Sequence, residues 1–277
     1  MKGMLLLAAL LAIALAAAGC TGTGPGTTTP VPGTPGAADA SVNETLRVFA
    51  SGAQQSLDRV DANVSSAAAI LATTGLTGPG SESVLLNLSR SGNQSGNYSI
   101  DAVTFDTDGK VLAVMPEDYQ FAVGANIHGS SNVLAALNGT PGLSQRINLV
   151  EGFRGVALSY PVRNTSGVAG GVSLTIRPER LLAVSALAAL GNTSHALSAV
   201  QTDGTIVLDA NPRMIGQSIL NATQYGGATD LAKIAQEIVS TPSGFERYQG
   251  NGTTRAVAWQ TVGLHGTAWR LVVNQER

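Results

Sequence analysis

Few side chains in this 277-residue chain could do chemistry, and the best candidates are aromatic. Aromatic residues make up only 4% of the sequence, and several of them share one stretch with an arginine. The candidates for binding a small molecule are Tyr98, Tyr119, Phe121, Arg154 and Tyr160. Small-molecule sites are mainly apolar with a few orienting polar groups, and an arginine can pair with a carboxylate through two hydrogen bonds. The alternative is that Arg154 lies on a strand surface and the tyrosines belong to the core.

A weaker set of candidates lies nearer the C-terminus and consists of Asp209, Tyr225, Tyr248 and Trp259. Trp259, like Trp269, stands among apolar residues on a predicted strand, which favours a place in the core. Asp209 precedes a proline-containing turn and could simply cap it. These residues therefore form a second choice for a binding site.

No constellation of residues predicts catalysis. The three histidines, His128, His195 and His265, have neither the spacing of metal ligands nor a nucleophile motif nearby. No glycine-rich phosphate loop follows a predicted strand. The net charge of −2 provides no basic surface for nucleic acid. We expect a protein that is not an enzyme, has no cofactor or metal, and does not bind nucleic acid.

The first 20 residues are predicted to be a signal peptide that ends in a special cysteine. Lys2 precedes an apolar run, Met4–Ala18, that is too short to span a bilayer comfortably. The run leads into Ala17-Ala18-Gly19-Cys20, which resembles the lipobox of secreted lipoproteins, where cleavage leaves a lipid-carrying cysteine at the N-terminus. Cys20 is the only cysteine, so it cannot form an internal disulfide. We expect a secreted lipoprotein anchored by Cys20 to lipid at the outer face of the cytoplasmic membrane; the alternatives are an ordinary signal peptide and an uncleaved anchor.

Residues 21–40 are mainly Thr, Gly, Pro and Ala without apolar periodicity, so they are predicted to form a flexible linker. Ten of the 15 asparagines in the chain lie in Asn-x-Ser/Thr motifs, the acceptors of N-linked glycans. They are Asn43, Asn63, Asn87, Asn93, Asn97, Asn138, Asn164, Asn192, Asn221 and Asn251. The alternative is that loops rich in Ser, Thr and Asn produce the motif without glycosylation. Together with the lipobox, the motifs suggest an archaeal cell surface.

One supersecondary pattern occurs twice in the chain. Residues 105–113 and 200–208 each place a Thr-Asp-Gly turn between two apolar strands. Asp-Gly suits a tight hairpin because glycine adopts a positive φ without steric cost. A proline and then a Gly-x-x-Ile segment follow each hairpin, at 124–127 and 216–219. The repetition predicts two tandem domains of the same fold.

A long helix is predicted to precede both copies. Apolar residues recur at steps of three and four from Leu46 to Leu71, Ser41 and Glu44 form a capping box, and Gly75 ends the helix. Such a stripe packs against the rest of the protein or pairs with a second copy in a homodimer. We expect further helices at 79–90, 131–138, 179–190 and 228–239, a loop at 116–121, and strands at 98–106, 110–115, 144–150, 153–162, 168–176, 195–201, 205–209, 244–249, 253–261 and 267–273. Two mainly antiparallel sheets with flanking helices make an α+β protein.

This tandem arrangement resembles the double Cache domains, the extracytoplasmic PAS-like sensors of receptor kinases and chemotaxis receptors. Residues 202–209, with Pro212 and Gly216, are similar to the second-domain hairpin of that family. Residues 151–153, 160–162 and 170–174 look like strands of its first domain, and 259–270 resembles the closing strands of Cache-type proteins of methanogenic archaea. The resemblance implies a helix at 41–75, a membrane-distal domain at 76–177, a connecting helix at 178–194 and a membrane-proximal domain at 195–277.

Two departures limit what the resemblance implies. Family members that bind amino acids carry an Arg-x-Trp pattern and a downstream Asp, and this sequence has no Arg-x-Trp. Receptors of the family continue into a transmembrane helix and an output domain, whereas this sequence stops at Arg277. We therefore expect a sensor-type lipoprotein without its own output domain that binds a small organic ligand, such as a carboxylate, and works with a separate transmembrane transducer. The alternatives are a structural glycoprotein of the envelope and a substrate-binding protein that serves a permease.

Overall fold

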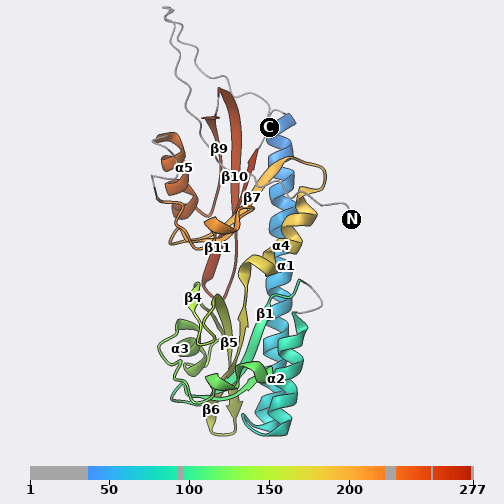
Figure 1. The fold of residues 1–277 in the computed structure, drawn as a ribbon, viewed down its shortest axis with the longest axis vertical. Helices are drawn as coiled ribbons and strands as arrows, with labels where there is room; N and C mark the ends of the chain where they lie inside the picture. Colours follow the sequence, from blue (N-terminus) through green and yellow to red (C-terminus); the bar gives the residue numbers. More distant parts are fainter. Residues whose placement is uncertain (1–36, 93–95, 222–228, 251, 276–277) are drawn as a thin grey trace, which may run out of the picture.

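One long helix and two sheets dominate the molecule. The computed structural model describes residues 37–92, 96–221, 229–250 and 252–275. Helix α1 (Ala37–Thr74) runs beside two antiparallel sheets that follow one another along its length (Figure 1). Helix α2 (Pro79–Ser91) and helix α4 (Pro178–Leu190) also pack on α1. The predicted α+β architecture with a long N-terminal helix is confirmed. We call the sheet near α2 the distal half and the other the proximal half.

Helix α1 buries the apolar stripe that its sequence predicts. The eight residues of the stripe are all buried: Leu46, Phe49, Ala53, Leu57, Val60, Val64, Ala67 and Leu71. They join residues of both sheets in one continuous core. The helix begins at Ala37, so the predicted capping box at Ser41 is wrong: the residues before Ser41 continue the helix, and Glu44 instead pairs with Arg47 at 2.6 Å. The helix ends as predicted before Gly75, which has φ 88°.

The distal sheet has the order β2-β1-β6-β5-β3, with β4 also pairing with β5. Its strands are β1 (Ser99–Phe105), β2 (Val111–Met115), β3 (Gly142–Leu143), β4 (Ile147–Asn148), β5 (Arg154–Asn164) and β6 (Gly167–Ile176). Only residues 147–148 of the strand predicted at 144–150 form a strand, β4, because the chain before them turns towards the proximal half, where the Arg146 N–H donates to Gln201 Oε1 at 3.0 Å. The loop predicted at 116–121 is a 3-10 helix, η2 (Glu117–Ala122). Helix α3 (Ser131–Leu137) lies on the side of this sheet away from α1 (Figure 1).

The proximal sheet repeats this plan with the order β8-β7-β11-β10-β9. Its strands are β7 (His195–Gln201), β8 (Ile206–Leu208), β9 (Ser243–Gly250), β10 (Thr253–Leu264) and β11 (Thr267–Gln275). The 3-10 helix η3 (Pro212–Met214) follows β8, and helix α5 (Thr229–Ser240) packs on β9. None of the helices in the described part of the chain combines the length and apolar character that a membrane span requires.

The repeated Gly-x-x-Ile segments form the same backbone hydrogen bonds in both halves. Gly124 N–H donates to Val111 O at 2.9 Å, and Gly216 N–H donates to Ile206 O at 2.8 Å. Three residues later each isoleucine N–H donates to the glycine of the Asp-Gly turn, at 2.8 Å in the distal half and 2.9 Å in the proximal half. Both segment glycines have a positive φ, 87° and 88°. The repeat seen in the sequence is therefore a repeat of backbone geometry.

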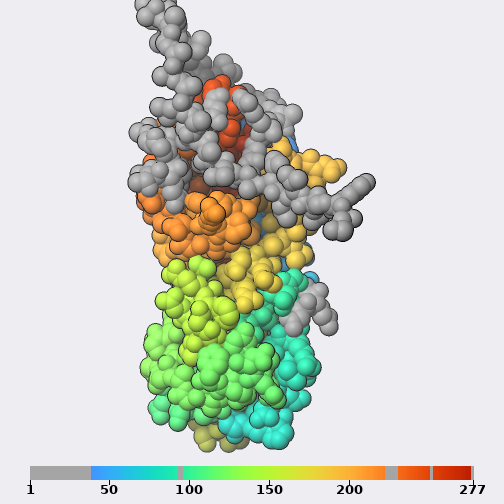
Figure 2. Space-filling view, in the orientation of Figure 1, coloured from blue at the N-terminus to red at the C-terminus, as the bar shows by residue number. Residues whose placement is uncertain are grey.

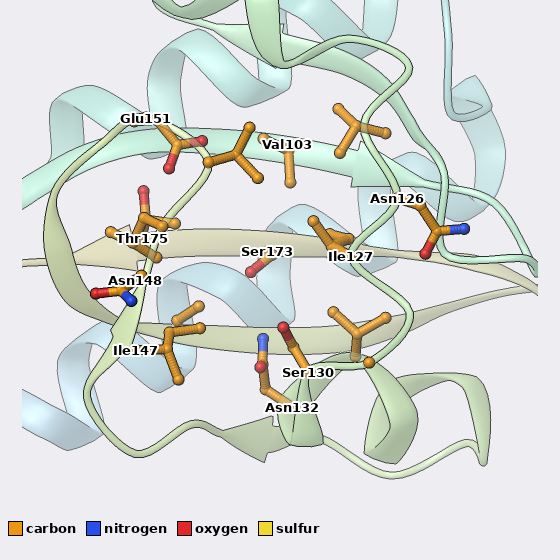
Figure 3. A pocket seen from close by; sticks show the side chains of 16 residues that line it. Val103, Asn126, Ile127, Ser130, Asn132, Ile147, Asn148, Glu151, Ser173 and Thr175 are labelled. Atoms are coloured by element: carbon orange, nitrogen blue, oxygen red, sulfur yellow. The ribbon is translucent and has the colours of Figure 1, made fainter.

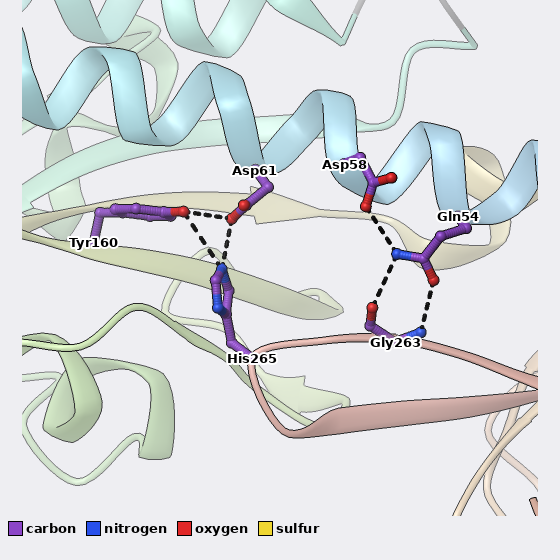
Figure 4. A network of polar contacts seen from close by, with 6 residues as sticks. All are labelled: Gln54, Asp58, Asp61, Tyr160, Gly263 and His265. Carbon is purple, nitrogen blue, oxygen red and sulfur yellow. Dashed lines mark hydrogen bonds and ion pairs between the residues drawn. The ribbon is translucent and has the colours of Figure 1, made fainter.

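A polar junction joins the halves through α1. Asp61 on α1 accepts hydrogen bonds from the Tyr160 hydroxyl of β5 at 2.7 Å and lies 2.6 Å from Nε2 of His265, in the β10–β11 turn (Figure 4). The Tyr160 and His265 rings meet edge to face, with centroids 5.7 Å apart. Two helical turns earlier, the Gln54 amide forms two hydrogen bonds with the backbone of Gly263, each 3.1 Å. The proximal hairpin tip is thus fixed to α1 and to a distal strand.

Candidate ligand-binding site

The two faces of the distal sheet differ in composition. Because side chains alternate along a strand, Leu174 and Ile176 of β6 face the α1 core, whereas Ser173 and Thr175 face the other way. Ala102 of β1 likewise packs in the α1 core, which turns Asp101 to the face that carries Ser173 and Thr175. All six of these residues are buried. The face away from α1 is therefore buried and yet polar.

This polar face borders a cavity of about 230 Å³. Two segments cover it: residues 126–133, which lead into α3, and residues 147–151, which include β4 (Figure 3). Part of this cover, coloured green, forms the front of the distal half in the space-filling view (Figure 2). The polar side chains that line the cavity are Asn126, Ser130, Asn132, Asn148, Glu151, Ser173 and Thr175. The cavity is small, since pockets for drug-sized ligands occupy about 300–1,000 Å³.

Asp101 is the most deeply buried acid near the cavity, with 0% of its surface exposed. Its backbone N–H donates to the Thr175 hydroxyl at 3.1 Å, and that hydroxyl donates to Asp101 Oδ1. Oδ2 has no hydrogen-bond partner. Burial, and next the repulsion by the Glu151 carboxylate, raise the pKa of Asp101 to about 8. Asp101 therefore carries a proton for most of the time at neutral pH.

Asn132 supplies a second unsatisfied polar atom. It lines the cavity from α3, is 2% exposed, and its Nδ2 donates to the Ser159 hydroxyl at 2.7 Å. Its Oδ1 is buried without a partner. Buried polar groups in folded proteins are nearly always hydrogen-bonded. Two buried polar atoms without partners near one cavity therefore indicate a place where a bound molecule completes the hydrogen bonding.

The matches to known proteins fall on the same region. A family model for the sensor domain of HK/GC/chemotaxis-like proteins matches residues 55–178, a stretch that contains every residue lining the cavity. The ligand-binding domain of the Pseudomonas fluorescens chemoreceptor CtaA, solved with L-serine, superposes with a TM-score of 0.61 at 16% identity, covering 86% of this chain and 96% of that one. The fold is that of a chemoreceptor-type, Cache-like sensor domain.

Two further structures share this sensor-domain fold. An extracellular ligand-binding receptor from Desulfohalobium retbaense has a TM-score of 0.70 at 29% identity; the match covers 84% of this chain and only 39% of that one. The ligand-binding domain of the Pseudomonas aeruginosa chemoreceptor PctC, solved with GABA, has a TM-score of 0.61 at 18% identity and covers 86% and 99% of the two chains. No protein of curated function matches the chain.

None of the five distal residues predicted to bind ligand lines the distal cavity. Tyr98 is buried in the α1 core, and Tyr160 is held by the carboxylate on α1 described above. Tyr119 is half-buried and packs beside Phe121, which is 64% exposed, with 6.2 Å between the ring centroids. Arg154 is exposed at the start of β5. A binding role for these five stays a prediction, and the structure does not bring them together.

Three of the four proximal candidates make contacts that stabilise the fold. Tyr248 and Trp259 are buried; the Tyr248 hydroxyl donates to Asn274 Oδ1 at 2.9 Å, and Trp259 Nε1 donates to the hydroxyl of the threonine after α5 at 3.1 Å. Asp209 accepts a hydrogen bond from the N–H two residues further on, at 2.8 Å. Tyr225 lies outside the described residues. Within the described residues, no three His, Cys, Asp or Glu side chains are placed to hold a metal ion.

A sequence signal for the cavity residues exists, although aromatic content does not reveal it. Polar Ser173 and Thr175 alternate with large apolar residues in a strand that continues at both ends in apolar residues, and Asp101 stands in a similar strand. The sequence of a strand that is covered on both faces is usually apolar at nearly every position. Regularly spaced polar residues in such a strand therefore predict that Ser173 and Thr175 share one face, whereas the burial of that face comes from the segments that cover it.

Proposed function

We propose that this chain is an extracytoplasmic small-molecule-binding domain of sensor type and that its ligand occupies the distal cavity. The observation that carries the proposal is the pair of buried polar atoms without hydrogen-bond partners, Asp101 Oδ2 and Asn132 Oδ1, beside a partly open cavity that several polar side chains line. Leaving a buried polar atom unpaired costs about 1–3 kcal/mol, which a ligand that pairs with it would recover. The proteins that share the fold are named as ligand-binding receptors or domains, which supports a binding role here.

Anchoring at the outer membrane face through Cys20 is part of the same proposal. Cys20 lies outside the described residues, as do the glycosylation candidates Asn93 and Asn251. Of the eight described candidates, seven are exposed: Asn43, Asn87, Asn97, Asn138, Asn164, Asn192 and Asn221. Asn63 is half-buried on α1. Exposed acceptors are compatible with glycosylation of an extracytoplasmic protein, and a separate transmembrane transducer would receive the ligand-bound state.

A thermal-shift screen of the full chain tests the binding function. The panel would contain amines, amino acids, organic acids and sugars small enough for a 230 Å³ space. A ligand at about 100 times its Kd stabilises the folded state by about 2.7 kcal/mol, which should raise the Tm by several degrees. Ser173→Leu, which fills the cavity, should abolish the shift, whereas Ser243→Leu, the same change at an exposed position on β9, should leave it intact.

Two results would contradict the proposal. One is that no member of the panel shifts the Tm. The other is that Ser173→Leu binds the ligand as tightly as the unaltered protein does. Either would favour a structural role in the envelope. Dependence of ligand uptake into cells on a permease would instead favour a transport role.

A further inference from the structure

The charged groups that line the distal cavity or contact its lining directly are carboxyl groups. Among the described residues that line it, Glu151 is the only charged one, and the Asp101 carboxyl group interacts with two lining residues, Thr175 and Glu151. No lysine, arginine or histidine of the described chain lines the cavity. Arg177 lies near this end of the sheet, but its guanidinium is stacked on the Phe153 ring, 5.1 Å from the centroid.

A cluster of acids alone would not show what binds, but the amide of Asn132 is an independent indication. Its Nδ2 is already used to donate to Ser159, so the atom left over is Oδ1, an acceptor. The Thr175 hydroxyl is likewise used to donate to Asp101. A ligand that satisfies Asn132 Oδ1 must therefore bring an N–H or O–H donor.

We infer that the distal cavity binds an organic ammonium ion that carries no carboxylate. This inference rests on the proposed binding function and adds the chemical class of the ligand. An ammonium group has three donors and a positive charge, which matches the Asn132 oxygen and the two carboxyl groups. A carboxylate would meet Asp101 and Glu151 without a cationic side chain to pair with.

The rest of the lining fits the hydrocarbon part of such a ligand. Val103, Val111, Ile127, Val133 and Leu149 contribute apolar side chains to the cavity, several of them visible around the polar groups in Figure 3. A space of about 230 Å³ equals that of about eight water molecules at ~30 Å³ each. A primary amine with a short aliphatic or single-ring body is of this size.

Binding of a cation should displace a proton from Asp101. The groups that face Asp101 are Glu151 and Thr175, with the Tyr119 hydroxyl and Arg177 farther along the same end. Burial and Glu151 raise the pKa of Asp101 to about 8, so the empty site is mostly protonated there. An ammonium ion favours the carboxylate form, and the proton leaves to solvent. The affinity for an amine should therefore increase from pH 6 to pH 8, by up to about tenfold per pH unit.

Isothermal titration calorimetry with three matched probes tests the ligand class. The probes are isoamylamine, L-leucine and 4-methylpentanoate, which share one branched chain and carry the ammonium group, both charged groups, or the carboxylate alone. Butylamine and phenethylamine extend the amines to a smaller and a larger body. We expect the best amine to bind at least about tenfold more tightly than leucine and 4-methylpentanoate, with proton release detected as a dependence of the heat on the buffer.

Three variants show whether the carboxyl groups are responsible. Asp101→Asn and Glu151→Gln should each weaken amine binding about tenfold or more, because each removes a potential negative charge beside the ammonium. Asp118→Asn, which removes an exposed carboxylate from the same half, should change it less than about twofold. Glu151 is only half-buried, so Glu151→Gln provides the test even if Asp101→Asn perturbs folding.

Failure of the ammonium inference can be distinguished from failure of the proposed binding function. Tighter binding of leucine, or binding of 4-methylpentanoate, would overturn the ammonium inference, leave the binding function standing and point to Arg177 as the partner of a carboxylate. If none of the three amines binds but another class of ligand in the screen does, the ammonium inference is also overturned. Absence of any ligand in the whole screen would refute the proposed function itself.

Discussion

Asp101 should make the stability of the folded protein depend on pH. Its pKa is raised from an ordinary 3.8 to about 8, first by burial and then by Glu151. As the pH rises above about 4, the unfolded chain loses this proton while the folded protein keeps it. The free energy of unfolding should therefore fall between about pH 5 and pH 8, by at most ~1.4 kcal/mol per pH unit from this group, and level off at higher pH.

Urea unfolding of the ligand-free protein and of Asp101→Asn at pH 5, 6.5 and 8 would measure this effect. The amide cannot ionise, so the variant should gain stability relative to the unaltered protein as the pH rises. Asp118→Asn is the control, because its exposed carboxyl group should show no such gain. A difference between the two proteins that is constant across these pH values would show that Asp101 is already ionised in the folded state.

Single residues of the site differ in how far the sequence predicts them. Asp101, Ser173 and Thr175 reach the cavity through strand alternation, which is a local property and can be read from the period of two. Asn132 comes from a different element, and its contact with Ser159 spans 27 positions of sequence. Only the packing of α3 on β5 produces that contact, so residue types and spacing could not predict it.

At the scale of elements, the junction between α1 and the β10–β11 turn should be a measurable source of stability. Asp61→Ala removes the acceptor of the Tyr160 hydroxyl and the partner of His265, and we expect the free energy of unfolding to fall by about 1–3 kcal/mol. Asp118→Ala is the control, because Asp118 is an exposed acid on η2, outside this junction, and its loss should change stability by less than about 0.5 kcal/mol.

A double-mutant cycle with Asp61→Ala and His265→Ala isolates the contact itself. The two changes should be non-additive by at least about 0.5 kcal/mol in urea unfolding, because both remove one interaction. Strict additivity would mean that the contact between Asp61 and His265 adds nothing to the stability of the protein. The apolar stripe of α1 follows from helical periodicity, but this contact joins residues 204 positions apart, and Tyr160 was predicted to bind ligand from its residue type alone.

At the scale of the whole molecule, we expect α1 to make the distal and proximal halves one folding unit. Its stripe joins residues of both sheets in a single core, so neither sheet can lose α1 without exposing apolar surface of the other. The only tryptophans, Trp259 and Trp269, are both buried in the proximal half. Their fluorescence therefore reports on proximal structure, whereas ligand and cavity belong to the distal half. A substitution in the distal half that shifts the tryptophan transition of the proximal half would establish that the two halves unfold together.

Leu158→Ala provides that change. Leu158 is fully buried on β5, facing α1, and its truncation should lower the free energy of unfolding by about 2–5 kcal/mol. Because the core is shared, the tryptophan transition in urea should shift as far as the transition seen by circular dichroism. Leu187→Ala, an exposed position on α4, should shift neither. If tryptophan fluorescence keeps its midpoint while circular dichroism splits into two transitions, the halves unfold independently, and occupation of the distal cavity could not be transmitted to the proximal half through their common core.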